Sequence, residues 1–254
     1  MSGPREYATL TTNIHNLSIR LSIGPPQSCV RPLMNLHRCM AFRHFVFDFD
    51  GTLADSADWV MRTFNDVAKR HGFRNVSDEE LQMLRGRPNR EIVKYLGVPA
   101  WKLPIIATDM RKRVAANIDK IKPFPGVHAL LTGLAERGAY ITVVTSNSEA
   151  NVRGVLGPES STYVHQFECG ASLFGKASKF KHAIKTSGIP LAQTLCVGDE
   201  TRDIDAAKEI GVTCAAVLWG YATPEVLKAH TPNYVCATMD EVLQLACELP
   251  PPSR

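Results

Sequence analysis

Two carboxylates stand two residues apart at the end of a short apolar run. The run begins at His44 and leads into Asp48, Phe49, Asp50 and Gly51. In open α/β sheets, functional sites form beyond the carboxyl ends of the strands. Two acids at this spacing can divide the work, one as nucleophile or metal ligand and the other as general acid and base. Solvated loops also contain such pairs of acids, so further motifs are needed to show whether this pair is functional.

A second pair of acids, Asp199 and Asp203, follows another apolar run. If a helix begins at Glu200, both acids lie near its first turn and converge on the same space. Oxygen ligands of this type suit a hard cation, which favours Mg²⁺. Acids in a first helical turn also complement the helix dipole without any metal. The pair alone leaves both interpretations open.

The elements that must position these acids are short apolar runs that alternate with amphipathic helical patterns. This order is typical of a parallel sheet covered on both faces. The expected strands are Phe45–Phe47, Tyr140–Val144, Val164–Phe167, Thr194–Val197, Thr213–Leu218 and Tyr234–Cys236. The sequence therefore predicts an α/β fold with a doubly wound parallel sheet.

Residues 57–122 interrupt this alternation, because helical patterns follow one another there without an apolar strand between them. We expect an all-helical insertion, bounded by Asp55–Ser56 and by the rigid turn Pro123–Gly126. The predicted domains are an α/β core at 41–56 and 123–254 and a helical cap at 57–122.

Residues 1–40 show no persistent period and are predicted to be a poorly ordered N-terminal extension. They contain four arginines and one glutamate. This composition fits organelle targeting, but a leader or an over-long start before Met40 is favoured. The seven cysteines, none in C-x-x-C spacing, indicate buried thiols in a reducing compartment. We therefore expect a cytoplasmic location.

The composition is that of an ordinary globular protein, with 44% hydrophobic and 21% charged residues and a formal net charge of +4. Beyond the short cluster Arg111–Arg113, Lys and Arg form no run or helical stripe, which disfavours a nucleic-acid partner. No run approaches the ~18 apolar residues of a membrane span. The expected partner is a small molecule, and the sequence predicts no oligomeric state.

The first pair of acids belongs to the longer pattern D-x-D-G-T at Asp48–Thr52, and three further motifs follow it in order. They are Ile141–Asn147, Lys176 after Phe174-Gly175, and Val197–Asp203. Together the four motifs resemble those of the haloacid dehalogenase-like hydrolase superfamily. The chain is similar to the phosphoglycolate phosphatase-like group, which has a small helical cap. The resemblance covers residues 41 to about 245.

The resemblance implies a Rossmann-like α/β core with an inserted α-helical cap, and a Mg²⁺-dependent phosphatase for a small phosphorylated metabolite. Asp48 is then the nucleophile that forms an aspartyl-phosphate, and Asp50 is the general acid and base. Thr145 donates to a phosphoryl oxygen, and Lys176 neutralises the phosphoryl group together with Asp48. Lys179, three residues further on, is the alternative cation.

The resemblance also implies ligands and binding residues around these groups. Mg²⁺ is expected to bind Asp48, the backbone carbonyl of Asp50 and Asp199. Asp203 is expected either as a further ligand or as a residue that supports the ligands without contacting the metal. Ser146 and Asn147 are expected to bind substrate through side-chain or backbone N–H groups. In the third motif, Ala177 stands where several relatives have proline, so the chain departs from the family pattern there.

Two arginines of the cap, Arg85 and Arg87, flank Gly86 between expected helices and are candidate substrate-binding residues. If the cap closes over the acids, they can pair with a polar leaving group. The alternative is that both are solvated surface charges.

Three other functions fit the fold. A dehalogenase needs neither the second acid nor Mg²⁺, so Asp50 and the Asp199/Asp203 pair argue against it. A sugar-phosphate mutase typically has a histidine shortly after the first motif, and Ala57–Val60 contains none. A catalytically silent binding or regulatory module is also possible in principle, although the chain retains all four motifs.

Overall fold

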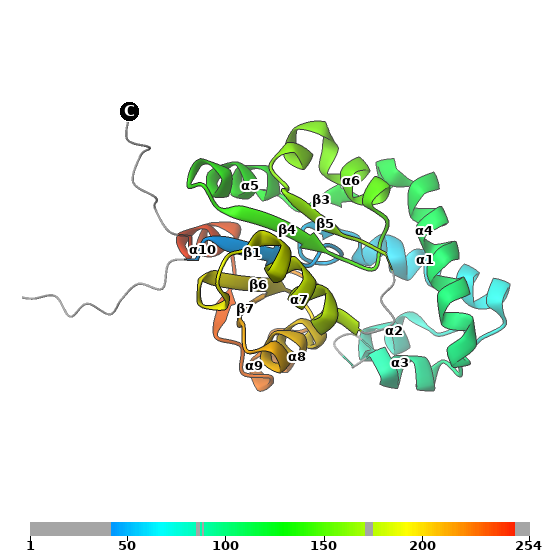
Figure 1. Ribbon diagram of the computed structural model, residues 1–254. Helices are drawn as coiled ribbons and strands as arrows, with labels where there is room; N and C mark the ends of the chain where they lie inside the picture. Colours follow the sequence, from blue (N-terminus) through cyan, green and yellow to red (C-terminus); the bar gives the residue numbers. More distant parts are fainter. Residues whose placement is uncertain (1–41, 85–86, 88, 171–174, 247–254) are drawn as a thin grey trace, which may run out of the picture. The chain divides into compact units, whose positions relative to one another are not determined.

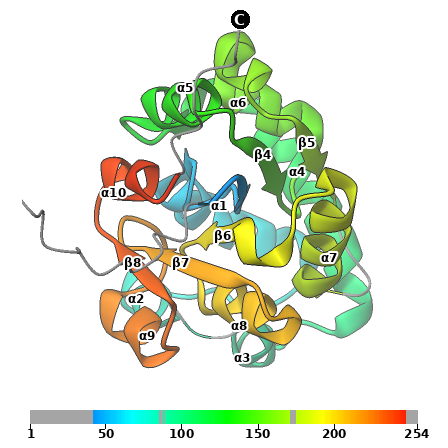
Figure 2. The ribbon, with the colours of Figure 1, turned by 60° about the vertical axis from the view of Figure 1, so that its left-hand side comes forward.

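The computed structural model describes residues 42–84, 87, 89–170 and 175–246. In these residues six parallel strands form one sheet in the order β5-β4-β1-β6-β7-β8 (Figures 1 and 2). The strands are β1 His44–Phe47, β4 Tyr140–Val144, β5 Gln166–Glu168, β6 Thr194–Gly198, β7 Thr213–Val217 and β8 Tyr234–Cys236. The predicted parallel α/β fold is confirmed.

The first strand lies in the middle of the sheet, between β4 and β6. Phe45 is in register with Ile141 on one side and Leu195 on the other. The chain therefore adds strands in both directions from β1, which makes the end of β1 the switch point where α/β proteins bind ligands. Asp48 follows β1 directly.

Alternate residues of each strand enter two separate hydrophobic cores. Phe45 and Phe47 pack on one face, whereas Val46 packs on the other. This alternation is the normal consequence of strand geometry. The first face is covered by α5 Val127–Glu136, α6 Glu149–Thr162 and α10 Met239–Gln244. The second face is covered by α7 Gly175–Ser187, α8 Thr201–Ile210 and α9 Pro224–Ala229.

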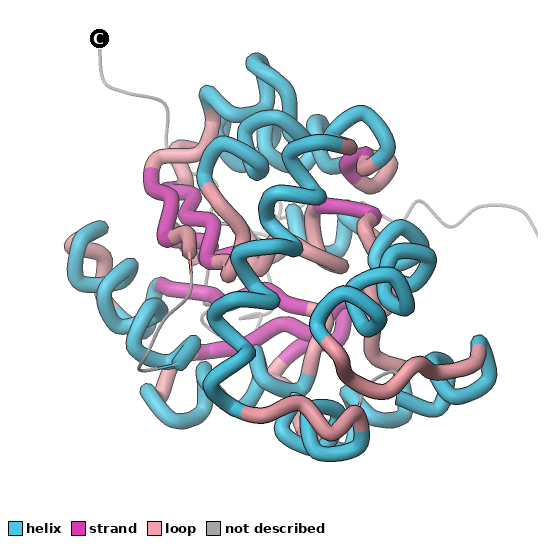
Figure 3. The backbone as a smooth tube through the Cα atoms, turned by 90° about the vertical axis from the view of Figure 1, so that its right-hand side faces the viewer, coloured by secondary structure: helices cyan, strands magenta, loops and turns pink. Residues whose placement is uncertain are grey.

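The segment between residues 56 and 122 is helical and adds no strand to the sheet (Figure 3). It contains α1 Ala57–His71, α2 Asp78–Leu84, α3 Asn89–Tyr95 and α4 Leu103–Ala116, with 3₁₀ turns at Ala100–Lys102 and Ile118–Lys120. Its helices share a small core of their own around Val76, Leu84 and Leu96. The predicted inserted helical cap is confirmed as part of the fold, while its exact domain boundaries stay a prediction.

The two ends of this insertion pair with each other. Strand β2, Ala54–Asp55, runs antiparallel to β3, Lys122–Pro123, with Ala54 opposite Pro123. These strands overlap the two predicted bounds of the insertion at Asp55 and at Pro123, although the sequence did not predict that they pair. Two-residue strands are too short to produce a recognisable alternating pattern.

One strand begins later than predicted. Val164 was expected in a strand, but its N–H bonds to the Ser161 carbonyl in the turn after α6, and β5 begins only at Gln166. The predicted extension 1–40 lies outside the described residues. Among the helices that the structure describes, none has the length and apolarity needed to cross a membrane.

Candidate active site

The acids of the first motif lie in a tight turn that leaves the end of β1. The Asp48 N–H still donates to Val197 O at 2.8 Å, and the N–H groups of Leu53 and Ala54 both return to Phe49 O at 2.9 Å. Gly51 has a φ of +83°, and a Cβ built on it would lie 2.2 Å from Asp199 Oδ2. This position therefore requires glycine both for its backbone conformation and for space.

Asp48 is buried and paired with a cation. Its Oδ2 lies 2.7 Å from Lys176 Nζ and 3.6 Å from Arg202, and its Oδ1 accepts the Phe49 N–H at 2.8 Å. Burial alone would raise the pKa of Asp48, but Lys176 and Arg202 outweigh it and hold that pKa below its ordinary value. The carboxylate is therefore ionised at neutral pH.

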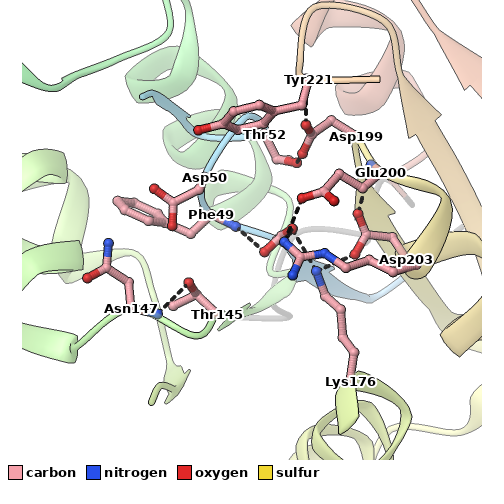
Figure 4. A network of polar contacts seen from close by, with 12 residues as sticks. Phe49, Asp50, Thr52, Thr145, Asn147, Lys176, Asp199, Glu200, Asp203 and Tyr221 are labelled. Carbon is pink, nitrogen blue, oxygen red and sulfur yellow. Dashed lines mark hydrogen bonds and ion pairs between the residues drawn. The ribbon is translucent and has the colours of Figure 1, made fainter. Parts of the chain in front are cut away.

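Lys176, in the first turn of α7, contacts two carboxylates, those of Asp48 and Asp203 (Figure 4). Burial opposes its charge, yet these two acids raise the pKa of Lys176 above its usual value. Lys179 points elsewhere, since its ammonium donates to the carbonyls of Thr145 and Glu168 at 2.5 and 3.0 Å. Of the two lysines, Lys176 is the one beside Asp48.

Three acids from two motifs, Asp48, Asp199 and Asp203, meet at the carboxyl edge of β1 and β6. One oxygen of each lies within 4.8 Å of the others, and all three residues are buried. Burial raises the pKa of Asp199 well above its usual range, and the charge of Asp48 adds to the rise. Burial also raises the pKa of Asp203, against the influence of Lys176.

Asp199 is oriented by two groups that the sequence interpretation did not assign. Thr52 Oγ1 donates to Asp199 Oδ1 at 2.7 Å, and the Tyr221 N–H donates to Asp199 Oδ2 at 2.8 Å (Figure 4). Thr52 is part of the first motif, so the sequence contained a signal for it. Tyr221 belongs to none of the four motifs.

Asp203 helps to begin helix α8, for which Glu200 is the N-cap residue. The Glu200 N–H donates to Asp203 Oδ2 at 3.0 Å, and the Glu200 side chain accepts from the Asp203 backbone in return. This reciprocal pair is a capping box. The helix start expected at Glu200 is confirmed, and it turns both Asp199 and Asp203 toward Asp48.

Asp50 lies in the same turn but outside this cluster. Its Oδ1 accepts from Ser56 Oγ at 3.0 Å, and Ser56 Oγ is 2.9 Å from the Tyr221 hydroxyl. Burial, reinforced by the charge of Asp48, raises the pKa of Asp50 to about 6. Asp50 is thus suited to carry a proton, while Asp48 is not.

The second motif forms the loop after β4. The Asn147 N–H donates to Thr145 Oγ1 at 3.0 Å, and Asn147 Oδ1 accepts from the Asn151 amide at 2.8 Å. Thr145 and Asn147 are buried, whereas Ser146 is exposed. The Ser146 carbonyl accepts from Arg111 of α4 at 3.2 Å, which links this loop to the insertion.

The structure describes only one of the two cap arginines that were predicted to bind substrate. Arg85 lies outside the described residues. Arg87 lines the cavity described next, donates to the Met83 carbonyl at 3.2 Å and lies 3.8 Å from Glu91.

Arg202 was not predicted as a site residue, although it is inside the fourth motif. It contacts Asp48 at 3.6 Å and Glu200 at 2.6 Å.

A cavity of about 410 Å³ lies between the motif loops and the insertion. On the core side it is lined by polar residues, namely Asp50, Ser146, Asn147, Glu200, Arg202 and Tyr221. On the insertion side it is lined by Arg87, Arg111 and apolar side chains from α1 to α4. A volume of this size is in the range of small-molecule sites, roughly 300–1,000 Å³.

Known proteins match this chain over the same region. The family model described as haloacid dehalogenase-like hydrolase matches residues 45–217. Phosphoglycolate phosphatase from Synechococcus elongatus is 28% identical over 205 residues, which cover 80% of this chain and 97% of that protein. A 5'-nucleotidase from Pseudomonas aeruginosa is 24% identical and covers 81% of this chain and 96% of its own length.

Among solved structures, a haloacid dehalogenase-like family protein from Streptococcus pneumoniae superimposes with a TM-score of 0.67. It is 21% identical and covers 80% of this chain and 97% of its own, so it supports the fold alone. The chain belongs to the haloacid dehalogenase-like hydrolase family. The predicted family is confirmed, and phosphatase-named relatives support the predicted class of phosphoric monoester hydrolase.

Proposed function

We propose that the chain hydrolyses small phosphomonoesters through a phosphoryl group held transiently on Asp48, with Mg²⁺ as cofactor. The observation that carries this proposal is the ionised Asp48 carboxylate, buried 2.7 Å from Lys176 and beside two further buried acids. Asp50, whose pKa is raised to about 6, lies two residues away on the wall of the cavity.

The chemistry of the three acids fits a divalent cation. Asp48 Oδ2 and Asp203 Oδ1 are buried and, among the described residues, lack hydrogen-bond partners; both are ion-paired with Lys176, and Asp48 Oδ2 also lies 3.6 Å from Arg202. Burial raises the pKa of Asp199 and repulsion by Asp48 adds to the rise, so a cation beside the three acids would relieve this repulsion. Asp48, Asp199 and Asp203, with the Asp50 carbonyl, would hold Mg²⁺, which neutralises phosphoryl charge when bound.

In the proposed reaction Asp48 attacks phosphorus, and the bond between phosphorus and the leaving-group oxygen breaks. Asp50 gives its proton to that oxygen, so the alcohol leaves neutral. Asp50 then takes a proton from a water molecule, and the resulting hydroxide attacks the phosphorus of the aspartyl-phosphate. Inorganic phosphate leaves, and both acids return to their starting states.

The cationic and hydroxyl groups around Asp48 stabilise charge on the phosphoryl oxygens. Lys176 is close enough to contact Asp48 and a phosphoryl group bound to it. Thr145, Ser146 and Asn147 lie on the loop after the neighbouring strand β4 and supply hydroxyl and backbone N–H donors. These contacts with the phosphoryl oxygens are the proposed roles of the second and third motifs.

The nucleophile is tested with purified protein, Mg²⁺ and a set of phosphomonoesters that includes 2-phosphoglycolate, by following phosphate release. Asp48→Asn should abolish turnover while the melting temperature stays close to that of wild type. The matched control is Asp58→Asn, because the Asp58 side chain is 85% exposed and pairs only weakly with Arg62 at 4.0 Å. Normal rates for Asp48→Asn would refute the nucleophile.

The cofactor is tested by removing it. A chelator should stop phosphate release, and added Mg²⁺ should restore it. Ca²⁺ should restore it poorly, because Ca²⁺ accepts longer and less regular coordination. Full activity in excess chelator would exclude the proposed metal.

A further inference from the structure

The two walls of the cavity above Asp50 differ in chemistry. The six core residues that line it are polar or charged. The insertion, in contrast, contributes nine apolar side chains to the lining: Val60, Met61, Phe64, Leu81, Leu84, Ile92, Ala107, Met110 and Val114. A ligand that fits both walls has a charged head and an apolar body.

The apolar wall consists of particular helix faces. On α4, Ala107, Met110 and Val114 follow the i, i+3, i+7 spacing that places side chains on one face. On α1, Val60, Met61 and Phe64 follow the i, i+1, i+4 spacing of one helix face. Val60, Met61, Ala107 and Met110 are only partly buried and lie outside the hydrophobic clusters of the described residues. Their apolar surface is therefore available to a ligand.

The arginines that line the cavity already have partners within the protein. Arg111 donates to the Ser146 carbonyl and to Thr108, and Arg87 donates to the Met83 carbonyl. Arg202 is paired with Glu200, so these two charges of the core wall offset each other. A carboxylate on the leaving group would share the arginines with the partners that they already have.

We infer that the preferred substrate is a phosphomonoester whose leaving group carries an apolar body, seated against α1 and α4. This inference rests on the proposed function, because it places the phosphate at Asp48. A two-carbon acid such as glycolate offers almost no apolar surface to this wall. An alkyl or aromatic body of six or more carbon atoms covers it and removes both surfaces from water.

The direct test is a homologous series of substrates with one head group. Ethyl, butyl and hexyl phosphate are compared with 2-phosphoglycolate at fixed Mg²⁺, and kcat/KM is measured for each. A buried methylene is worth about fourfold, so kcat/KM should rise on the order of 100-fold from ethyl to hexyl. A flat series, or a preference for 2-phosphoglycolate over hexyl phosphate, overturns the inference.

A pair of methionine variants locates the effect. Met110→Gln places a polar group of similar size on the cavity wall, so the hexyl-to-ethyl ratio of kcat/KM should fall about fivefold or more. Met83→Gln is the matched control, because Met83 is 42% exposed and does not line the cavity. Its ratio should equal that of wild type. Equal ratios in both variants overturn the assignment of this wall.

A binding measurement separates this inference from the proposed function. Ethyl-, butyl- and hexylphosphonate cannot be hydrolysed, so their dissociation constants can be measured by calorimetry with Mg²⁺ present whether or not the protein turns over esters. If no ester is hydrolysed, the proposed function fails. The substrate assignment falls with it, but the apolar wall still stands as the binding surface for an alkyl body if affinity rises with chain length, and this too fails if affinity is constant along the series.

Discussion

His44 begins the strand that ends at Asp48, and its imidazole is completely buried. Its Nε2 lies 2.9 Å from Thr142 Oγ1, and its Nδ1 lies 3.1 Å from Ser187 Oγ. Burial, with a smaller contribution from His165, lowers the pKa of His44 to about 4 from its ordinary value of 6.5. The folded protein therefore keeps this imidazole neutral at pH values where the unfolded chain protonates it.

Because of this difference in the pKa of His44, mild acid lowers the stability of the folded protein over a defined range of pH. Between pH 6.5 and about pH 4 the unfolded chain binds more protons at His44 than the folded protein does. The free energy of unfolding therefore increases with pH across this window. The contribution is fully present above pH 6.5 and is lost as the pH falls. At 1.36 kcal/mol for each pKa unit, the loss amounts to about 3 kcal/mol.

The assay is urea unfolding of wild type, His44→Asn and His182→Asn at several pH values between about pH 4 and pH 7.5. Other groups also titrate in this range, so the useful quantity is the difference between the stability curves. From neutral to acid pH, His44→Asn should lose about 3 kcal/mol less than wild type. His182→Asn removes an imidazole that is 64% exposed and pairs with Glu168 Oε1 at 2.7 Å, so it controls for the loss of a surface histidine. Parallel curves for His44→Asn and wild type would refute the reasoning.

Three further predictions concern the active site. Thr52→Val removes the hydroxyl that donates to Asp199, so half-maximal activity should need about 10- to 100-fold more Mg²⁺; an unchanged metal titration contradicts this. Lys176→Met should lower kcat by about 100-fold or more, and a kcat within tenfold of wild type would assign the charge to another cation. Arg87→Ala should change KM for ethyl and hexyl phosphate equally, because the Arg87 guanidinium bonds the Met83 carbonyl and an alkyl group offers it no polar partner; a selective rise of KM for hexyl phosphate would contradict this.

The sequence was sufficient for the fold and for the acids at the strand ends, whereas Thr52 and Arg202 were missed although both lie within the motifs. Tyr140–Val144 and Tyr234–Cys236 were predicted with the bounds that the structure has, because apolar runs bounded by polar residues identify buried strands. The approach of Asp48, Asp199 and Asp203 also followed, since parallel strands end at one edge of the sheet. Their catalytic and metal-binding roles stay predictions.

Contacts between distant segments were beyond the reach of sequence patterns. Tyr221 reaches Ser56 across 165 positions, and Trp219 donates from its indole to the Thr52 carbonyl across 167. Nothing in the local spacing indicates either contact. Lys176 and Lys179 could not be told apart either, because residues three apart lie on the same side of a helix. Only the folded chain separates them, since Lys176 meets Asp48 while Lys179 binds backbone carbonyls.

Because β2 pairs with β3, the two ends of the insertion lie side by side where the chain leaves and re-enters the core. Ala54 faces Pro123 in an antiparallel pair, where Cα atoms are about 4.5–5.5 Å apart, so the chain leaves and re-enters the core at nearly one point. A hairpin turn of a few residues can bridge such a gap, and the entropy of closing a longer connection grows only slowly with its length. The insertion is in this sense a replaceable module. The insertion can therefore be shortened, enlarged or replaced while the chain still leaves and re-enters the core at Asp55 and Lys122, provided that the contact of Val114 with the main core is also replaced.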